Sequence, residues 1–284
     1  MTSGVLGLII CPMFDDNLVY SLEHDTEDRV ITLVTNGHEN SLSRKLDKRG
    51  IGYERISWND VVCRRYRPDT DRFNILAYSI DLALHSKPEF LKSTVEDLAR
   101  DMQPYIDAIG FYLGTCGNYA WDIPKWCEAN GLKPSAMFRD PNGIPCDDCV
   151  GVAIGGGPRY LELQKKYTGH FYLFPAMANN YEDFMMADQA DSAAAIESLD
   201  DEARETLGIE PGRDGYIRWL FRLGGYEYIL KLDTGIGERE VLEADMASVA
   251  ERTQLKLKDP EDGWVTLQPT DDLYRECKAM LSKT

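Results

Sequence analysis

Short apolar runs rich in β-branched residues alternate with amphipathic segments of helical period along most of this chain. The runs predict strands at Val5–Ile10, Val30–Thr35, Tyr53–Ile56, Ile75–Tyr78, Ala108–Tyr112, Ser135–Phe138, His170–Phe174, Tyr226–Leu232 and Trp264–Leu267. Between strands, Ser41–Arg49 and Pro88–Pro104 predict helices, and Gly50 supplies a C-terminal stop for the first of them. This alternation is typical of parallel sheets that are covered by helices on both faces.

The length of the chain and the spacing of its strands set the expected architecture. Its 284 residues suffice for two lobes with substantial cores. The strands are spaced too irregularly for a (β/α)₈ barrel. We therefore expect an α/β fold of two Rossmann-like, doubly wound lobes with mostly parallel sheets. The lobes are placed at residues 1–130 and 131–284, and the acidic, helix-patterned residues 187–220 form an insertion or a connection.

The net charge of the chain limits the classes of partner that it is expected to bind. The formal net charge is −17, and no basic stripe opposes it, so neither nucleic acid nor an anionic membrane surface is an expected partner. No apolar run reaches the roughly 18 residues that a membrane-spanning helix needs. The apolar run Val5–Ile10 lacks the flanks of a signal peptide and is better explained as a buried strand, which predicts a cytoplasmic location.

Cysteine is the residue type that most directly suggests chemistry. The chain has seven: Cys11, Cys63, Cys116, Cys127, Cys146, Cys149 and Cys277. An odd number in a long chain without a secretory signal is not typical of a disulfide framework. The remaining roles for the cysteines are core packing, metal binding and redox chemistry. Packing is the expected role for the three in or near helical patterns, Cys63, Cys127 and Cys277.

Three of the cysteines are expected where sites form in open α/β sheets, at the carboxyl ends of strands. Cys11 and Cys116 closely follow predicted strands. Cys149 lies at a predicted helix start, with Asp147 or Asp148 as its N-cap. Backbone N–H groups in the first turn of a helix favour a thiolate, and thiolates are the form that binds metals.

Three thiolates on one centre would leave a coordination position open, which is typical of catalysis or substrate binding. Sulfur ligands favour zinc or a [4Fe–4S] cluster over magnesium. Cys146 is a possible fourth ligand, through the C-x-x-C spacing with Cys149. Two alternatives stay open: a dithiol redox pair of Cys146 and Cys149, and cysteines that only pack in the core.

A family resemblance rests on four phrases in this order: AIGFYLGTCGN at residues 108–118, Asp148-Cys149, Arg159-Tyr160 and Asp233-Thr234-Gly235. With Cys11 before an acidic pair and the strand from Gly169 to Pro175, they resemble the domain of unknown function 1638 family over nearly the whole chain. This family occurs in methanogenic archaea and some bacteria and often accompanies corrinoid-dependent methyltransferase systems. The resemblance therefore implies one-carbon metabolism as the context.

Carried over residue by residue, the family's cysteine pattern falls on Cys11, Cys116 and Cys149. The chain departs from the family in two places. A histidine commonly precedes the family's Asp-Cys pair, and the family's Pro-Gly-Trp follows the strand of the 170s; here these stretches read Cys146-Asp147 and Pro175-Ala176-Met177. The identity of a fourth ligand and of any substrate contact therefore stays open.

Three further features have a functional and a plain interpretation. Gly155, Gly156 and Gly157 offer backbone N–H groups to a phosphate, or form a tight turn. Asp233 follows a predicted strand and acts as a base or ligand partner, or caps a turn. Arg139 binds an anionic substrate group, or pairs with one of the many carboxylates.

The leading hypothesis is a metal- or iron–sulfur-dependent enzyme, or enzyme accessory, that acts on a small molecule in corrinoid methyl transfer. Corrinoid methyltransferase proteins are the implied partners, and a thiol, a methylated compound or an anion is the implied substrate. The first alternative is a non-enzymatic binding or delivery protein for methyltransferase systems. The second is a dithiol redox protein that uses Cys146 and Cys149.

Overall fold

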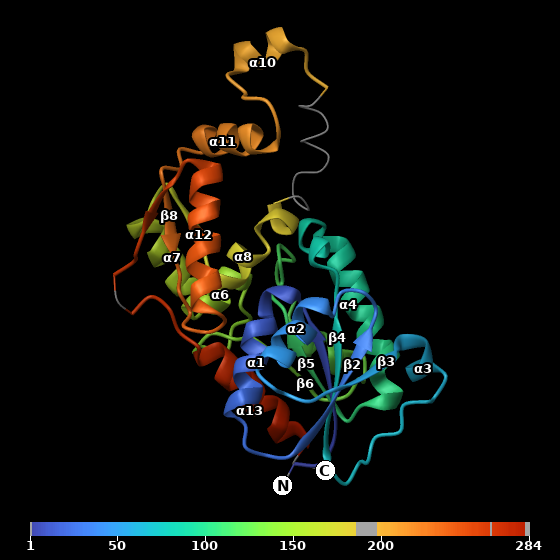
Figure 1. Cartoon of the computed structure of the whole chain (residues 1–284). Coiled ribbons are helices and arrows are strands. Elements are labelled where there is room, and N and C mark those ends of the chain that lie inside the picture. Colours follow the sequence, from blue (N-terminus) through green and yellow to red (C-terminus); the bar gives the residue numbers. More distant parts are fainter. Residues whose placement is uncertain (1, 186–197, 262, 282–284) are drawn as a thin grey trace. The chain divides into compact units, whose positions relative to one another are not determined.

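The computed structural model describes residues 2–185, 198–261 and 263–281, which fall into two compact units (Figure 1). Unit 1 comprises Met1–Gly157 and Thr266–Thr284, and unit 2 comprises Pro158–Val265. Strand β6 (Ser135–Met137) lies beyond the sequence-based boundary at residue 130, yet it pairs with β5 in the sheet of unit 1. The last helix of the chain also returns to unit 1.

Unit 1 is built on one sheet of six parallel strands, in the order β3-β2-β4-β1-β5-β6. Besides β6, the strands are β1 (Gly4–Ile10), β2 (Arg29–Thr35), β3 (Glu54–Ser57), β4 (Phe73–Ser79) and β5 (Ala108–Tyr112). Every residue of β1 and β5 is buried, because helices cover both faces. The prediction of a Rossmann-like α/β fold with parallel pairing is confirmed.

The helices of unit 1 form a layer on each face of this sheet. They are α1 (Asp15–His24), α2 (Asn40–Lys48), α3 (Trp58–Val62), α4 (Pro88–Met102), α5 (Ile123–Ala129), α6 (Cys149–Ile154) and α13 (Gln268–Leu281). Helix α13 packs on β1, β5 and β6 beside α1, as Figure 1 shows. Helix α4 packs on the opposite face of the sheet. A Cβ added at Gly7 of β1 would meet Met102, at the end of α4, and Ile106. A Cβ added at Gly110 of β5 would instead meet Cys277 of α13.

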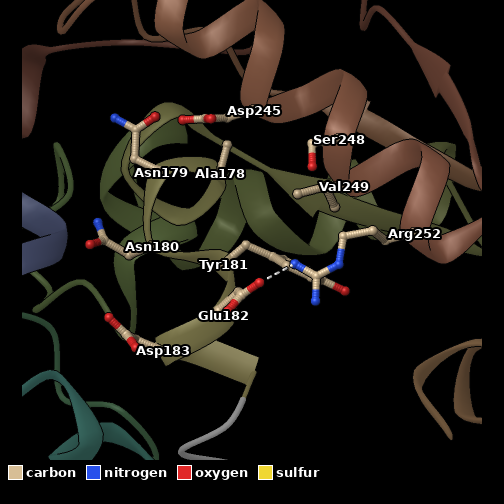
Figure 2. Close-up of a pocket in the computed structure, with 10 residues that line it drawn as sticks. All are labelled: Ala178, Asn179, Asn180, Tyr181, Glu182, Asp183, Asp245, Ser248, Val249 and Arg252. Atoms are coloured by element: carbon tan, nitrogen blue, oxygen red, sulfur yellow. Dashed lines mark hydrogen bonds and ion pairs between the residues drawn. The ribbon is translucent and has the colours of Figure 1, made fainter. Parts of the chain in front are cut away.

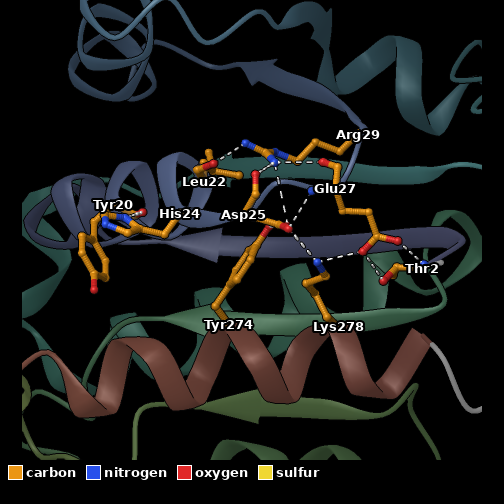
Figure 3. A network of polar contacts seen from close by, with 9 residues as sticks. All are labelled: Thr2, Tyr20, Leu22, His24, Asp25, Glu27, Arg29, Tyr274 and Lys278. Atoms are coloured by element: carbon orange, nitrogen blue, oxygen red, sulfur yellow. Dashed lines mark hydrogen bonds and ion pairs between the residues drawn. The ribbon is translucent and has the colours of Figure 1, made fainter.

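A polar network ties α13 to the first strands (Figure 3). The Lys278 ammonium lies 2.8 Å from carboxylate oxygens of both Asp25 and Glu27. The Tyr274 hydroxyl donates to Asp25 at 2.7 Å, and Arg29 donates to the carbonyl oxygen of Asp25 at 2.9 Å. The C-terminal helix is thereby fixed to the connection between α1 and β2.

The order of the strands places a switch point at the centre of the sheet. Strands β1 and β4 are neighbours at the centre. From β1 the chain continues to β2 on one side of this pair, and from β4 it continues to β5 on the other side. Ligands of open α/β sheets bind outside the carboxyl ends of strands at such a point. Cys11 is the residue that directly follows β1.

Unit 2 is smaller and holds a three-stranded parallel sheet in the order β7-β8-β9. Its strands are β7 (His170–Leu173), β8 (Tyr228–Lys231) and β9 (Lys256–Lys258), and its helices include α7 (Gly157–Lys166), α8 (Pro175–Asn179), α10 (Asp201–Leu207), α11 (Arg213–Leu223) and α12 (Arg239–Thr253). Of the acidic stretch 187–220, α10 and part of α11 are helical as expected, and residues 187–197 lie outside the described residues.

One predicted strand is wrong. Trp264–Leu267 is not a strand: its Trp264 ring instead lies near the guanidinium of Arg159 and the ammonium of Lys166. The third strand of the sheet is β9, whose sequence Lys-Leu-Lys is exposed throughout and lacks an apolar run. Across the described ranges, none of the helices combines the length and the apolar character needed to traverse a bilayer.

Candidate functional site

Cys11 lies where β1 ends and the chain turns into α1. Ile10 is in register with Tyr112 of β5, and the N–H of Cys11 donates to the carbonyl oxygen of Tyr112 at 3.0 Å. The Cys11 carbonyl accepts from Phe14 N–H at 2.8 Å, which closes the short turn Pro12–Phe14. These bonds hold Cys11 beside the segment through which β5 continues toward Cys116.

Cys116 lies in a strained turn after β5. Its φ is 44°, in the left-handed region that non-glycine residues rarely adopt, and the φ of Gly117 is 82°. The N–H of Cys116 donates to the carbonyl oxygen of Asp147 at 2.7 Å, and the Thr115 hydroxyl donates to the same oxygen at 3.1 Å. Two donors from the turn after β5 therefore bind one carbonyl of the loop that precedes Cys149.

Gly114 allows these two loops to approach closely. A Cβ at Gly114 would lie 2.8 Å from Asp148 Cα and 2.9 Å from the Asp147 carbonyl oxygen, and neither backbone atom can easily move. Cys149 is the first residue of α6, and its N-cap Asp148 accepts a hydrogen bond from Gly151 N–H at 2.6 Å. The N-cap expected from the sequence is confirmed at Asp148.

The three thiols lie within electrostatic range of one another. Burial raises the pKa of the Cys11 thiol, and Cys116 raises it further. Burial also raises the pKa of Cys149, followed by the charges of Asp148, Cys116 and Cys11. In the part of the chain that the structure describes, no cationic side chain contributes to either shift. The structure thus places the three cysteines that the sequence singled out near one another, and burial together with negative neighbours opposes the thiolate forms of Cys11 and Cys149.

The three cysteine side chains do not already form a metal-binding geometry. Among the residues that the structure describes, no three His, Cys, Asp or Glu side chains form a group that fits a metal ion. The donor chemistry nevertheless fits a soft ion, because all three groups are sulfur. Cys11, Cys116 and Cys149 are the residues that would hold zinc or a cluster.

Cys146 belongs to different surroundings. Its side chain is fully buried, and its N–H donates to the carbonyl oxygen of Phe138 at 3.0 Å. Burial raises the pKa of its thiol to about 12, together with the charges of Asp140, Asp147 and Asp148. The neighbours that raise the pKa of the Cys146 thiol are therefore carboxylates.

Asp15 is a residue of this site that the sequence analysis did not assign. Its side chain is 1% exposed at the start of α1, and neither carboxylate oxygen has a hydrogen-bond partner among the described residues. Burial raises the pKa of the Asp15 carboxyl to about 7, although Lys45 and Ser41 lower it. Lys45 itself forms an ion pair with Asp16 at 2.8 Å. The only signal in the sequence is the acidic pair after Cys11.

Arg139 and the glycines have structural partners within unit 1. Arg139 forms a two-bond ion pair with Asp122, at 2.7 and 3.1 Å. Gly155, with φ 87°, ends α6 as a left-handed cap, and a Cβ at Gly156 would lie 2.3 Å from the Asp140 Cβ. Gly157 begins α7. These placements match the plain interpretations, a salt bridge and a turn.

Asp233 lies in unit 2, after β8, and is exposed. Its carboxylate accepts a hydrogen bond from Gly235 N–H at 2.9 Å, which is the turn-capping arrangement. It therefore lies in the other unit from the three cysteines.

Unit 2 has a polar hollow of about 210 Å³ that no sequence motif indicated (Figure 2). Residues of α8 and α12 and the segment after α8 line it. Arg252 pairs with Glu182 at 2.8 Å and with Asp214 at 2.9 Å, and its guanidinium lies 5.4 Å from the centre of the Tyr181 ring. The cation of this hollow is thus already neutralised by the chain's own carboxylates.

A comparison with protein-family models identifies the family of the chain. The family model described as "Protein of unknown function (DUF1638)" matches residues 79–270, more than half of the chain. The match includes Cys116, Cys146, Cys149 and Asp233 and begins after Cys11. No curated protein matches the chain. The chain therefore belongs to the DUF1638 family.

Proposed function

We propose that unit 1 binds zinc or a [4Fe–4S] cluster through the thiolates of Cys11, Cys116 and Cys149, with a small molecule at the position left open. The observation that supports this most is that thiols from three separate segments are close enough to influence one another's pKa, with Cys11 directly after β1, one of the two strands at the switch point. A switch point is where open α/β sheets bind their ligands.

The hydrogen bonds of the two loops support a shared site. The Asp147 carbonyl binds both Cys116 N–H and the Thr115 hydroxyl, and only a glycine at position 114 fits against the Asp148 backbone. A strained left-handed residue such as Cys116 is typical of functional turns, since its cost must be offset elsewhere. The chain therefore fixes the backbones of two of the three cysteines relative to each other.

The charge of the surroundings favours a cation over a free reactive thiolate. A nucleophilic cysteine needs neighbours that lower its pKa, whereas burial and negative neighbours raise those of Cys11 and Cys149. A bound metal would provide the missing positive charge, with release of the thiol protons. When bound, it would also supply Lewis acidity toward an added ligand.

The function that follows is an enzyme, or an enzyme accessory, acting on a thiol, a methylated compound or an anion in corrinoid methyl transfer. The delivery-protein alternative uses the same site without turnover of the bound molecule. The dithiol alternative has less support, because burial raises the pKa of both the Cys146 and the Cys149 thiol, and Asp148 raises each further.

Metal analysis of anaerobically purified protein tests the proposal. We expect about one zinc ion per chain. For a [4Fe–4S] cluster, we expect about four iron ions per chain and a broad absorbance at about 400 nm. Cys11→Ser, Cys116→Ser and Cys149→Ser should each remove most of the metal. Cys63→Ser, at an exposed cysteine, is the matched control and should retain it.

Circular dichroism of each variant separates loss of metal from loss of fold. A folded wild-type protein that remains free of metal after anaerobic reconstitution would contradict the proposal, as would full metal content in all three serine variants. Metal loss in Cys146→Ser would add Cys146 as a fourth ligand.

A further inference from the structure

A second hollow lies at the opposite end of the same sheet. Its volume is about 590 Å³, and its lining comes from the loop Arg64–Thr70 before β4, the segment Gln103–Asp107 before β5, Lys133 before β6, and Val5 near the start of β1. All of these lie at the amino ends of parallel strands. Because β1 has seven residues at about 3.3 Å each, the hollow lies roughly 20 Å from the cysteines.

Three cations line this hollow without a carboxylate partner. Among the described residues, neither Arg64, Arg67 nor Lys133 forms an ion pair, and the Arg67 guanidinium donates only to the Tyr66 carbonyl at 3.1 Å. The one acidic residue of the lining, Asp107, accepts a hydrogen bond from Val5 N–H at 2.8 Å. The hollow therefore has an excess of positive charge.

This excess runs against the composition of the chain. The chain has 48 acidic and 31 basic residues, so a cavity lined by three cations and one carboxylate is opposite in charge to the chain as a whole. Neighbouring Arg65 differs from the three cations, since it is paired with Asp60 and does not line the hollow. Three unpaired cations around one cavity are an arrangement that an anionic ligand would complete.

The rest of the lining suits a molecule larger than a simple ion. Tyr66 is 9% exposed, and its buried hydroxyl has no hydrogen-bond partner among the described residues. Tyr105, Pro68 and Pro104 add apolar surface to the walls. Cavities of about 300–1,000 Å³ are typical for small-molecule and cofactor sites.

We propose that this hollow binds a phosphorylated small molecule of nucleotide size, with Arg64, Arg67 and Lys133 on its phosphate groups. Arginine and lysine are the usual phosphate partners, and arginine binds through paired N–H groups. The proposal is independent of the metal site, because no residue is shared between the two.

Calorimetric titration of the full chain tests this, with ADP, pyrophosphate and adenosine as probes at physiological salt. ADP and pyrophosphate should bind saturably, and adenosine should bind far more weakly. Arg67→Gln and Lys133→Gln should each weaken ADP binding about tenfold, the effect of losing one charge-assisted hydrogen bond. Arg64→Asn should do the same, since asparagine tolerates the left-handed φ of 58° at this position.

Arg65→Gln is the matched control, because it removes one positive charge at the residue next to Arg64. It should change the affinity for ADP less than twofold, which is about 0.4 kcal/mol. Cys116→Ser should bind ADP like the wild type, which separates this proposal from the metal site. Absence of saturable ADP and pyrophosphate binding would overturn it, as would equal losses in Arg65→Gln and Arg67→Gln. Unchanged melting temperatures verify that the variants are folded.

Discussion

At the scale of single residues, Asp15 is a carboxyl group whose surroundings oppose its charge. Its carboxyl is buried, has no hydrogen-bond partner among the described residues, and has a pKa of about 7. The ordinary carboxyl pKa is about 3.9, so between these values the folded chain holds a proton that the unfolded chain has released. Stability therefore falls as pH rises through this window.

Asp15→Asn should remove this cost, because the amide has no charge to bury. We expect the melting temperature to rise by several degrees at pH 8 and the gain to shrink steadily toward pH 4. Thermal unfolding of the metal-free protein at several pH values measures it. Asp101→Asn, at an exposed position of α4, is the control and should show no such trend. A gain that does not vary with pH would contradict the stated pKa.

At the scale of elements, the packing of α13 on the sheet depends on a missing side chain. A Cβ at Gly110 of β5 would lie 2.7 Å from the Cys277 sulfur and 2.8 Å from the Leu8 Cδ2. Cys277 is fully buried at this contact, as the packing interpretation of this cysteine expected. The absence of a side chain at Gly110 of β5 thus makes room for the Cys277 side chain of α13.

Gly110→Ala should destabilise unit 1 by about 1–3 kcal/mol, the usual cost of overpacking a core. Adding Cys277→Ala to this variant should recover part of the loss, because the smaller side chain makes room for the new methyl group. Denaturant unfolding of the wild type, both single variants and the double variant measures the coupling. Gly52→Ala, with open space around it, should be nearly neutral. Strictly additive effects would show that the two residues do not meet.

At the scale of the whole molecule, the chain's last helix completes the domain that its first strand begins. Lys278 on α13 holds Asp25 and Glu27, which lie between α1 and β2 (Figure 3). Its hydrogen bond, with those from Thr2, lowers the pKa of Glu27 to about 2, and the pKa of Asp25 is also lowered despite burial. Carboxyls with lowered pKa values stabilise the fold above their unfolded pKa and lose this effect as pH falls.

Lys278→Met should lower the stability of unit 1 at pH 7 by about 1–3 kcal/mol, because Glu27 loses its cation and Asp25 keeps only the longer ion pair with Arg29, at 3.9 Å. The difference from the wild type should narrow as pH falls from about 4 toward 2, where the carboxyls take up protons. Thermal unfolding over this range measures the difference, and Lys92→Met, at an exposed position of α4, is the control. A difference that is constant down to pH 2 would show that the network contributes nothing electrostatic.

Much of the fold is encoded locally, which is why the sequence predicts it. The apolar runs at Val5–Ile10 and Ala108–Tyr112 are buried strands, because short continuous apolar runs are typical of parallel strands covered on both faces. Strand β9 escaped prediction because its exposed Lys-Leu-Lys sequence has no apolar signal, and only pairing with β8 makes it a strand.

What the sequence determined by itself is the parallel α/β fold and the placement of Cys11 and Cys116 after strands, since both follow from patterns within a few residues. Only the tertiary structure decided the rest. It places Cys149 near Cys116 and Cys11, buries Cys146 and Asp15, and gathers Arg64, Arg67 and Lys133 around one hollow. The physical reason is that burial and charge depend on neighbours from distant segments, which the order of the strands brings together and no local pattern records.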